Sequence, residues 1–121
     1  MQRLEVSARN VANAMSDGPL PSADASVRAQ YPAAYVPQRV DQVEMAGGGT
    51  AAVISDVSPA TVATYQPQAP YADAQGMVAS PNVDPANEAV EQIIARYTFA
   101  MNAAVMRTYD RMMKTLLDIT T

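Results

Sequence analysis

The stretch that decides the fold closes the chain: DPANEAVEQIIARYTFAMNAAVMRTYDRMMKTLLDITT, residues 84–121. Asp84 is a residue type that caps helices, and Pro85 suits the first helical position, where no backbone donor is needed. Neither Gly nor Pro occurs between Ala86 and Thr121. At 1.5 Å per residue, the stretch predicts one helix roughly 50 Å long. A small domain cannot cover such a helix, so we expect it to need a partner.

Apolar residues recur along this helix at steps of mostly three or four, which places them on one face. We call this face the apolar stripe, and its members are Val90, Ile94, Tyr97, Met101, Val105, Met112, Leu116 and Ile119. Thr108 is the polar interruption in the series. Further Ala, Ile and Met residues widen the face, so the stripe resembles a coiled-coil seam with broad flanks. We expect it to pack against another protein surface.

Residues 2–14 predict a short helix that ends at the helix-breaking run Ser16-Asp17-Gly18-Pro19. One apolar line runs along it, formed by Leu4, Ala8, Val11 and Met15. Asn10 and Asn13 are poor interior helix residues, so we expect them to make contacts near the helix end. An antiparallel pairing of the two terminal helices would leave more than half of the long helix uncovered.

The middle of the chain predicts a small β region. Residues 16–34 read as an irregular connection. Gln38–Met45 and Thr50–Val57 read as two strands, and Gly47–Gly49 as the turn of a hairpin between them. Val62–Gln66 and Met77–Ala79 are shorter extended pieces. We therefore expect an α+β fold in which residues 1–15 and 84–121 form a helical domain with a coiled-coil-like antiparallel pairing. Residues 16–83 form its irregular and β-rich insert.

Composition limits the chemistry. The 121 residues include no His and no Cys, which removes the usual general base, the thiol nucleophile and the soft metal ligands. One Phe and no Trp leave few large core side chains. The net charge of −4 and the lack of a basic patch outside the last helix argue against nucleic acid and anionic membranes. No run approaches the ~18 apolar residues of a membrane span. We expect no catalytic, cofactor-binding or metal site, no nucleic-acid partner and no direct membrane insertion.

Several local clusters allow a second interpretation. Asp84, Glu88 and Glu91 could bind a metal ion, but capping and complementing the helix dipole is the expected role. Gly47–Gly49 lacks the Lys and the following helix of a phosphate-binding loop, which favours the hairpin turn. A copper site or simple packing could explain the methionines, and packing is favoured. The basic group Arg107, Arg111 and Lys114 could bind an acidic partner, but a solvated basic helix end is the favoured explanation.

Two segments resemble a known family. LEVSARNVANA at residues 4–14 is similar to the Asn-x-Ala-Asn signature near the N-terminus of bacterial flagellar rod and hook proteins. YADAQGMVASPNVDP at residues 71–85 resembles the stretch before the last helix in the proximal-rod members of that family. Residues that fit the family's last helix are Asn102, Val105, Thr108, Met112, Met113 and Leu117. The family's Ser-Arg-x-Tyr-x-x-Asn run becomes Arg96–Asn102 here, with Phe99 in place of Tyr and Tyr97 in place of Arg.

The resemblance implies an axial structural protein of the flagellar basal body, located in the periplasmic rod and exported by the flagellar export apparatus without a cleaved signal peptide. Its partners would be itself and other rod proteins, and it would transmit torque by helical packing. The assembly interface that we predict consists of Leu4, Ala8, Val11, Asn13, Val90, Ile94, Met101, Asn102, Val105, Met112 and Leu116. The alternative is a soluble adaptor or chaperone-like module that offers its last helix to one partner.

The chain starts several helical turns later than the family pattern. Its first apolar line is already in phase at the first residues, and no capping residue stands in front of it. We therefore expect the biological protein to begin upstream of Met1, or this copy to be defective in assembly.

Overall fold

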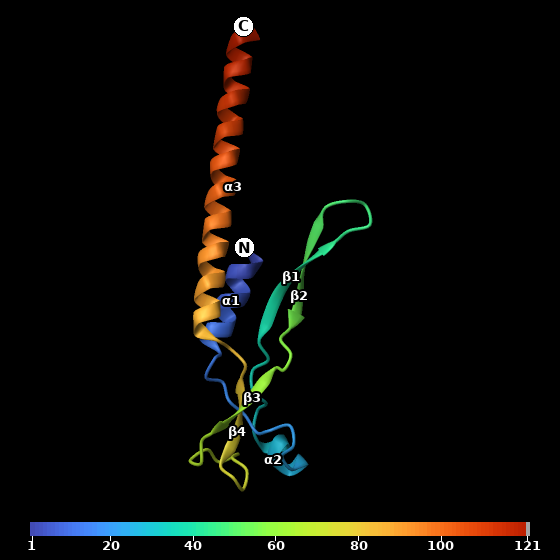
Figure 1. The fold of residues 1–121 in the computed structure, drawn as a ribbon, viewed down its shortest axis with the longest axis vertical. Helices are drawn as coiled ribbons and strands as arrows, with labels where there is room; N and C mark the ends of the chain where they lie inside the picture. The colour runs from blue at the N-terminus through green and yellow to red at the C-terminus, as the bar shows by residue number, and fades with distance from the viewer. Residues whose placement is uncertain (121) are drawn as a thin grey trace.

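The computed structural model describes residues 1–120, and Thr121, the last residue of the predicted helix, lies outside the described residues. In order, the elements are α1 (Gln2–Ala12), α2 (Ala25–Gln30), β1 (Gln38–Glu44), β2 (Thr50–Asp56), β3 (Thr61–Tyr65), β4 (Met77–Pro81) and α3 (Pro85–Thr120). Both ends of the described chain are helical, and two antiparallel strand pairs lie between them. This confirms the α+β class. Figure 1 shows α3 rising far beyond every other element.

The start of α3 follows the predicted signals. The Oδ1 atom of Asp84 accepts a hydrogen bond from the backbone N–H of Ala86 at 3.0 Å. The carbonyl of Asp84 accepts the first intrahelical bond from the N–H of Glu88, also at 3.0 Å. Pro85 is the first helical residue, where its missing N–H costs nothing. The helix then runs for 36 residues, which makes it about 54 Å long.

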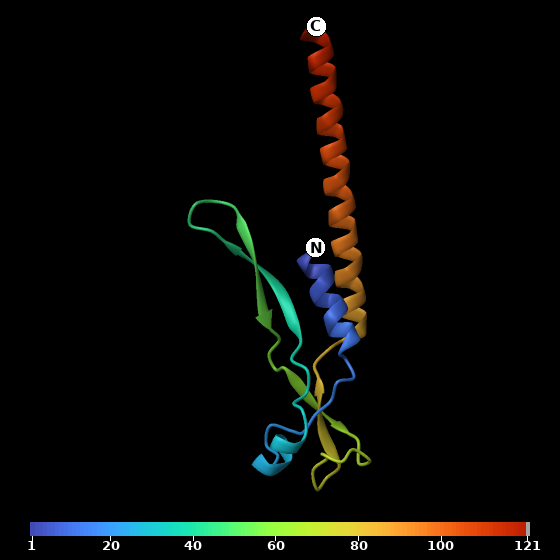
Figure 2. The ribbon, with the colours of Figure 1, turned by 180° about the vertical axis from the view of Figure 1, so that it is seen from behind.

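Helix α1 lies antiparallel against the first turns of α3, as Figures 1 and 2 both show. The buried residues of α1 are Val6, Ser7 and Asn10. The predicted apolar line of this helix is therefore not the face that packs within the chain. Ala8, Val11 and Met15 are exposed, and Leu4 is half-buried. The α1-facing side of α3 is polar in its first turns, so polar groups on α1 match it better than an apolar line does.

Strands β1 and β2 form the predicted hairpin, in register from Gln38 opposite Asp56 to Glu44 opposite Thr50. The turn closes through hydrogen bonds from Met45 N–H to the Gly49 carbonyl and from Gly48 N–H to the Met45 carbonyl. Gly48 and Gly49 have φ angles of 88° and 85°, a backbone conformation that residues with a Cβ rarely adopt. The Gly run is thus a turn, as expected.

The connection between the terminal helices is more ordered than predicted. The sequence interpretation of residues 16–34 as irregular misses α2, a short helix at Ala25–Gln30 that carries no buried residue. Its lack of an apolar face explains why no periodic signal marks it. Strands β3 and β4 pair antiparallel with Thr61 opposite Pro81, a pairing that the sequence interpretation did not anticipate.

Gly18 lies where three segments cross below α1. It exchanges two backbone hydrogen bonds of 2.9 Å with Ala79 of β4. On its other side, a Cβ atom at position 18 would lie 2.4 Å from the backbone N of Ala34 and 2.8 Å from the carbonyl O of Pro32. Only a residue without a side chain fits this crossing, which holds α1 over the small sheet β3–β4.

The buried core is small and sits at the junction of these elements. Its hydrophobic members are Val6, Val78, Ala79 and Ala95. Ala95 is the one buried residue of α3 within the described chain. From residue 104 to residue 120, every residue of α3 is exposed. We call residues 104–120 the bare half of α3. Because isolated helices are marginal in water, this half needs a partner to be stable.

Candidate functional site

The apolar stripe of α3 is a long row of exposed apolar side chains. The exposed fractions of its eight members, Val90 to Ile119, run from 43% to 75%. With about 3.6 residues per turn, Val90 and Tyr97 lie on the opposite side of α3 from Glu88 and Ala95, which face α1. The pairing with α1 therefore leaves most of the stripe uncovered, although Ile94 lines a groove together with Met1 and the hairpin residue Val40. Contiguous exposed apolar surface of this kind typically marks a protein–protein contact.

The structure places the predicted interface residues as follows. Those on α3 are all exposed: Val90, Ile94, Met101, Asn102, Val105, Met112 and Leu116. On α1, Ala8 and Val11 are exposed, while Leu4 and Asn13 are half-buried. Asn13 ends the helix, with its side-chain amide donating to the Arg9 carbonyl at 2.9 Å. Within the described chain, the exposed residues Ala8 and Val11 do not pack against the stripe. Their role in assembly stays a prediction.

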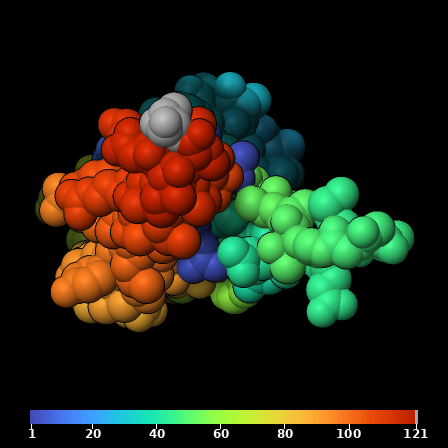
Figure 3. Space-filling model, turned by 90° about the horizontal axis from the view of Figure 1, so that it is seen from above, coloured from blue at the N-terminus to red at the C-terminus, as the bar shows by residue number. Residues whose placement is uncertain are grey.

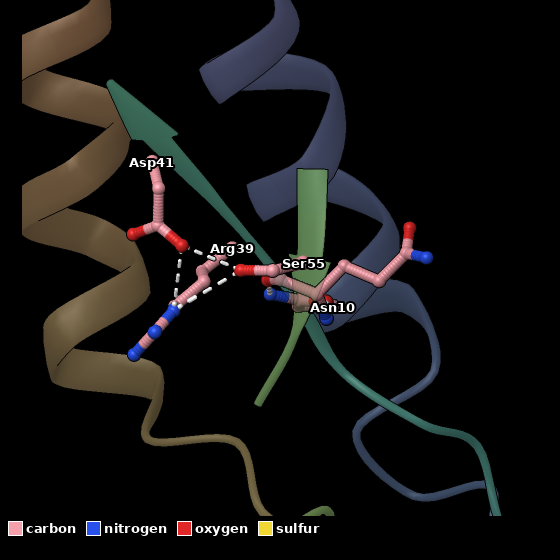
Figure 4. Close-up of polar contacts among 5 residues, drawn as sticks. Asn10, Arg39, Asp41 and Ser55 are labelled. Carbon is pink, nitrogen blue, oxygen red and sulfur yellow. Dashed lines mark hydrogen bonds and ion pairs between the residues drawn. The ribbon is translucent and has the colours of Figure 1, made fainter. Parts of the chain in front are cut away.

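Asn10 is the polar centre of the molecule, and it is 2% exposed. Its Nδ2 atom donates to the carbonyl of Gln38 and to Oε1 of Glu88, both at 2.8 Å. Its Oδ1 atom accepts from the Gln38 backbone N–H at 3.0 Å and from the Tyr35 hydroxyl at 3.1 Å. All donors and acceptors of the amide are thus used, and one side chain joins α1 to β1 and to α3. The close-up in Figure 4 shows Asn10 beside the hairpin.

The sequence interpretation treated Asn10 only as a contact-making residue near the helix end and did not place it in the interface. The available signal was an Asn in a helix interior, where its amide must find partners. The partner elements were not readable, because Gln38 and Glu88 are 28 and 78 residues away in the chain.

Two further polar contacts join α1 to α3, beside the buried apolar residues Val6 and Ala95. The Ser7 hydroxyl donates to the Glu88 carbonyl at 3.1 Å, and Arg3 pairs with Glu91 at 3.4 Å. We call Arg3, Ser7, Asn10, Glu88 and Glu91 the polar clamp. Because the polar clamp fixes α1 with hydrogen bonds rather than with the large apolar residues of α3, the stripe remains available to a neighbour.

Two side chains near the polar clamp have shifted pKa values. Burial raises the pKa of the Tyr35 hydroxyl, and the nearby Glu88 carboxylate acts in the same direction against the lowering effect of Arg9. On the hairpin, the Ser55 hydroxyl donates to Asp41 Oδ2, and Arg39 donates to the same oxygen at 3.0 Å (Figure 4). The Ser55 hydrogen bond is the main reason that the pKa of Asp41 is lowered, and Arg39 contributes to the shift. Both groups serve structure, since each lies in a hydrogen-bonded cross-link between segments.

The described polar residues form structural hydrogen bonds, and the largest apolar side chains of α3 are exposed. Within residues 1–120, no group of three or more Asp, Glu, His or Cys side chains is placed to hold a metal ion. None of the described helices combines the length and hydropathy that a bilayer crossing requires. Asp84 and Glu88, considered above as metal ligands, are engaged in capping α3 and in binding Asn10.

Comparisons with known proteins give a family match over the last part of the chain and relatives that match nearly all of it. Residues 74–119, which contain β4 and nearly all of α3, match the family model described as the C-terminal region of flagellar basal body rod FlgEFG proteins. Over the longer chain, the flagellar basal-body rod protein FlgC of Yersinia enterocolitica is 38% identical across 117 residues, covering 95% of this chain and 84% of that protein.

FlgC of Salmonella typhimurium is 39% identical across 120 residues, and FlgC of Escherichia coli O157:H7 is 38% identical across 120 residues. In each case the alignment again covers 95% of this chain and 84% of the relative. Identity at this level over nearly the whole chain includes the β insert as well as the terminal helices. The chain belongs to the FlgC family of flagellar basal-body rod proteins.

Proposed function

We propose that the chain is a structural subunit of the flagellar rod that is built into the rod through the apolar stripe of α3. The observation that carries this proposal is the position of the stripe on the side of α3 opposite α1. The polar clamp uses one side of the helix for the fold and leaves the apolar side for neighbouring subunits. Family membership supplies the kind of assembly in which such neighbours exist.

The free energy of covering the stripe is large enough to hold a subunit. Burying a large aliphatic or Met side chain from water is worth about 1.5–3 kcal/mol when complete, so covering a half-exposed one is worth about 1 kcal/mol. Stripe members such as Met101, Val105 and Met112 would together contribute several kcal/mol. Association consumes part of this gain through lost rotational and translational freedom, so a stable contact requires most of the stripe to be covered.

A packed helix face also explains how the subunit works without a reaction. Torque passes between subunits when their contacts are stiff and continuous, and close-packed apolar side chains resist sliding because interiors are dense and weakly compressible. The partners are further copies of this chain and other rod proteins, and the location is the periplasmic rod. We also propose that the chain reaches the rod through the flagellar export apparatus, without a cleaved signal peptide.

Deletion of the gene in its own bacterium tests the proposal. The mutant should be non-motile and its purified basal bodies should lack a continuous rod, while a plasmid copy should restore both. Motile cells with complete rods after deletion, in a strain with no second copy of the gene, would refute the proposal.

Sedimentation of the purified chain separates the rod subunit from the adaptor alternative. A rod subunit should show self-association that rises with concentration, because its stripe seeks an identical or related surface. An adaptor should remain monomeric and bind a single partner in a fixed ratio.

A further inference from the structure

The outer edges of β1 and β4 are occupied by other parts of the chain. At the base of β1, the Asn10 side-chain amide donates to the Gln38 carbonyl and accepts from the Gln38 N–H, as a neighbouring strand would. On β4, Ala79 exchanges two backbone hydrogen bonds with Gly18. A further strand therefore cannot pair with either edge at these positions.

The outer edge of β3 is open. Just beyond the strand, the N–H of Gln66 donates to the carbonyl of Gly76 at 2.8 Å. Bonded pairs alternate along an antiparallel ladder, so the backbone groups of Val62 and Thr64 face β4. The residues between them point their N–H and C=O groups outward, and within residues 1–120 these groups have no hydrogen-bond partner: Thr61, Ala63 and Tyr65.

The outer edge of β2 is open as well. The N–H of Val57 donates to the carbonyl of Pro37 at 2.9 Å, so the odd-numbered residues of β2 face β1. In Figures 1 and 2, β1 lies between β2 and the helices, and Figure 3 shows the hairpin projecting sideways from them. The backbone groups that point outward from β2 have no hydrogen-bond partner in the described chain: Thr50, Ala52, Ile54 and Asp56.

Open edges of this kind are unusual in a folded protein, because they can pair with another extended chain. Charged residues or Pro normally protect such an edge, but TAAVIS at residues 50–55 and TVATY at residues 61–65 contain neither. Two-stranded sheets are also marginally stable in water and gain stability from a third strand. Each of the two sheets in the described chain therefore has room for one more strand.

The two open edges cannot pair with each other inside one chain. Both β2 and β3 run away from the C-terminal end of α3, so their pairing would be parallel (Figure 1). Parallel strands need a connection of a dozen or more residues, whereas only residues 57–60 separate β2 from β3. Two copies with the same orientation, by contrast, can bring the β2 edge of one beside the β3 edge of the other.

A hollow beside the β3 edge fits side chains of an added strand. It has a volume of about 410 Å³, and its lining includes Pro19, Val36, Thr61 and Ala79. Ala79 lies opposite Ala63, so the hollow is on the side of the sheet to which Thr61 and Ala63 point. In a parallel pair, these two residues lie opposite odd-numbered residues of β2. Val53, which is 45% exposed, then comes to the same side.

We propose that the outer edge of β2 in one copy pairs in parallel with the outer edge of β3 in a second copy. The pairing joins β1–β2 and β3–β4 into one four-stranded sheet that spans two copies. It rests on the proposed function, which supplies neighbouring copies of one orientation, and it adds a contact that does not involve the stripe. Because the two edges differ, the contact is heterologous and extends from copy to copy.

Proline substitutions test the pairing, because Pro lacks the backbone N–H. Ala63→Pro blocks the β3 edge and Ala52→Pro blocks the β2 edge. Both remove outward N–H groups, a position where edge strands tolerate Pro, so both variants should melt close to the wild type. The matched controls Val62→Pro and Val53→Pro remove N–H groups that donate within the sheets and should lower the Tm clearly. The reverse order of melting temperatures would overturn the assignment of the open edges.

Sedimentation of the purified variants at high concentration then separates the possible pairings. Every chain in this test also carries Met112→Asp, so that contact through the stripe does not mask contact through the strands. This background chain should self-associate. Ala63→Pro alone and Ala52→Pro alone should each remain monomeric, because losing one backbone hydrogen bond weakens such a contact by about tenfold or more. Mixed together, the two variants should form a one-to-one dimer that does not grow, since one open edge of each kind remains.

Other pairings give different results. Dimers of Ala52→Pro alone would mean that two β3 edges pair, and dimers of Ala63→Pro alone would mean that two β2 edges pair. Either result overturns the proposal, as does a background chain that stays monomeric, and all three leave the rod function intact.

Incorporation into basal bodies gives an independent readout. The Ala63→Pro chain, without the Met112→Asp change, should be incorporated about tenfold less than the wild type at matched expression. Normal incorporation of this variant would overturn the strand pairing and leave the rod function intact. Absence of the wild-type chain from basal bodies would overturn both.

Discussion

Replacing Asn10 by Ala should loosen the junction of α1, β1 and α3 more than any other polar substitution in α1. The change removes the four hydrogen bonds that the amide makes to Gln38, Glu88 and Tyr35. The Gln38 N–H and carbonyl, the Glu88 carboxylate and the Tyr35 hydroxyl then lose a hydrogen-bond partner. Water replaces it poorly, because the site is buried and Asn10 is only 2% exposed.

The magnitude follows from the kind of bond lost. Each neutral hydrogen bond is worth about 1 kcal/mol and the one to the Glu88 carboxylate about 2 kcal/mol, so about 5 kcal/mol is the upper limit. Water can enter beside Glu88 and Tyr35, which are both half-buried, and it restores part of this. We therefore expect Asn10→Ala to cost about 3 kcal/mol, a large share of the stability of a chain with so small a core.

Hydrogen exchange at the Gln38 amide measures this directly, because that N–H donates to Asn10 Oδ1 at 3.0 Å. Its exchange in the purified protein should become about 150-fold faster in Asn10→Ala. Asn13→Ala is the matched control, since the Asn13 amide donates to Arg9 in its own helix and should cost about 1 kcal/mol or less. Unchanged exchange in Asn10→Ala, or an equal effect of both variants, would refute the role of Asn10 as the polar centre.

Other predictions follow from the crossing, the bare helix and the hairpin. Gly18→Ala places a Cβ 2.4 Å from the Ala34 backbone N and should cost about 2–4 kcal/mol in thermal unfolding, whereas Gly47→Ala meets nothing within 4 Å and should cost less than about 1 kcal/mol. Circular dichroism of a proven monomer should show less helix than α1 and α3 contain, because residues 104–120 lack tertiary contacts; full helicity with a sharp cooperative melt would contradict this. The folded-state pKa of Asp41 lies below its ordinary value of 3.8, so the unfolded chain binds the proton first and the stabilisation of the hairpin is lost as the pH falls from about 4 through that lower pKa. Ser55→Ala should raise the pKa of Asp41 in a carbon-detected titration, and an unshifted titration would show that Ser55 does not hold it down.

The sequence predicts those parts of the fold that local chemistry controls. Asp84 and Pro85 mark the start of α3 to the residue, and the Gly run fixes the hairpin turn, since both signals act within a few residues. The apolar stripe is equally readable, because its 3.6-residue period does not depend on which surface finally covers it.

The parts that were not predicted depend on contacts between distant residues. The β3–β4 pairing joins residues that are local neither to each other nor to a strong turn signal. In α1, apolar spacing identified Leu4, Ala8, Val11 and Met15, but burial within the chain follows the polar partners Glu88 and Gln38 and selects Val6, Ser7 and Asn10. Periodicity therefore located an apolar line without showing whether the chain itself or a neighbour covers it.

Incorporation of Met112→Asp into basal bodies tests the central claim most directly, because Met112 is exposed in the isolated chain and lies in the middle of the bare half. A carboxylate there costs little in the monomer but would leave an unpaired charge in the packed stripe, which is unfavourable by several kcal/mol. Asp110→Ala, two residues away, should be nearly silent. At matched expression, we predict that the Met112→Asp protein is not incorporated into rods and that its cells are non-motile. Cells that carry Asp110→Ala should swim normally. Normal rods and normal swimming with Met112→Asp would contradict it.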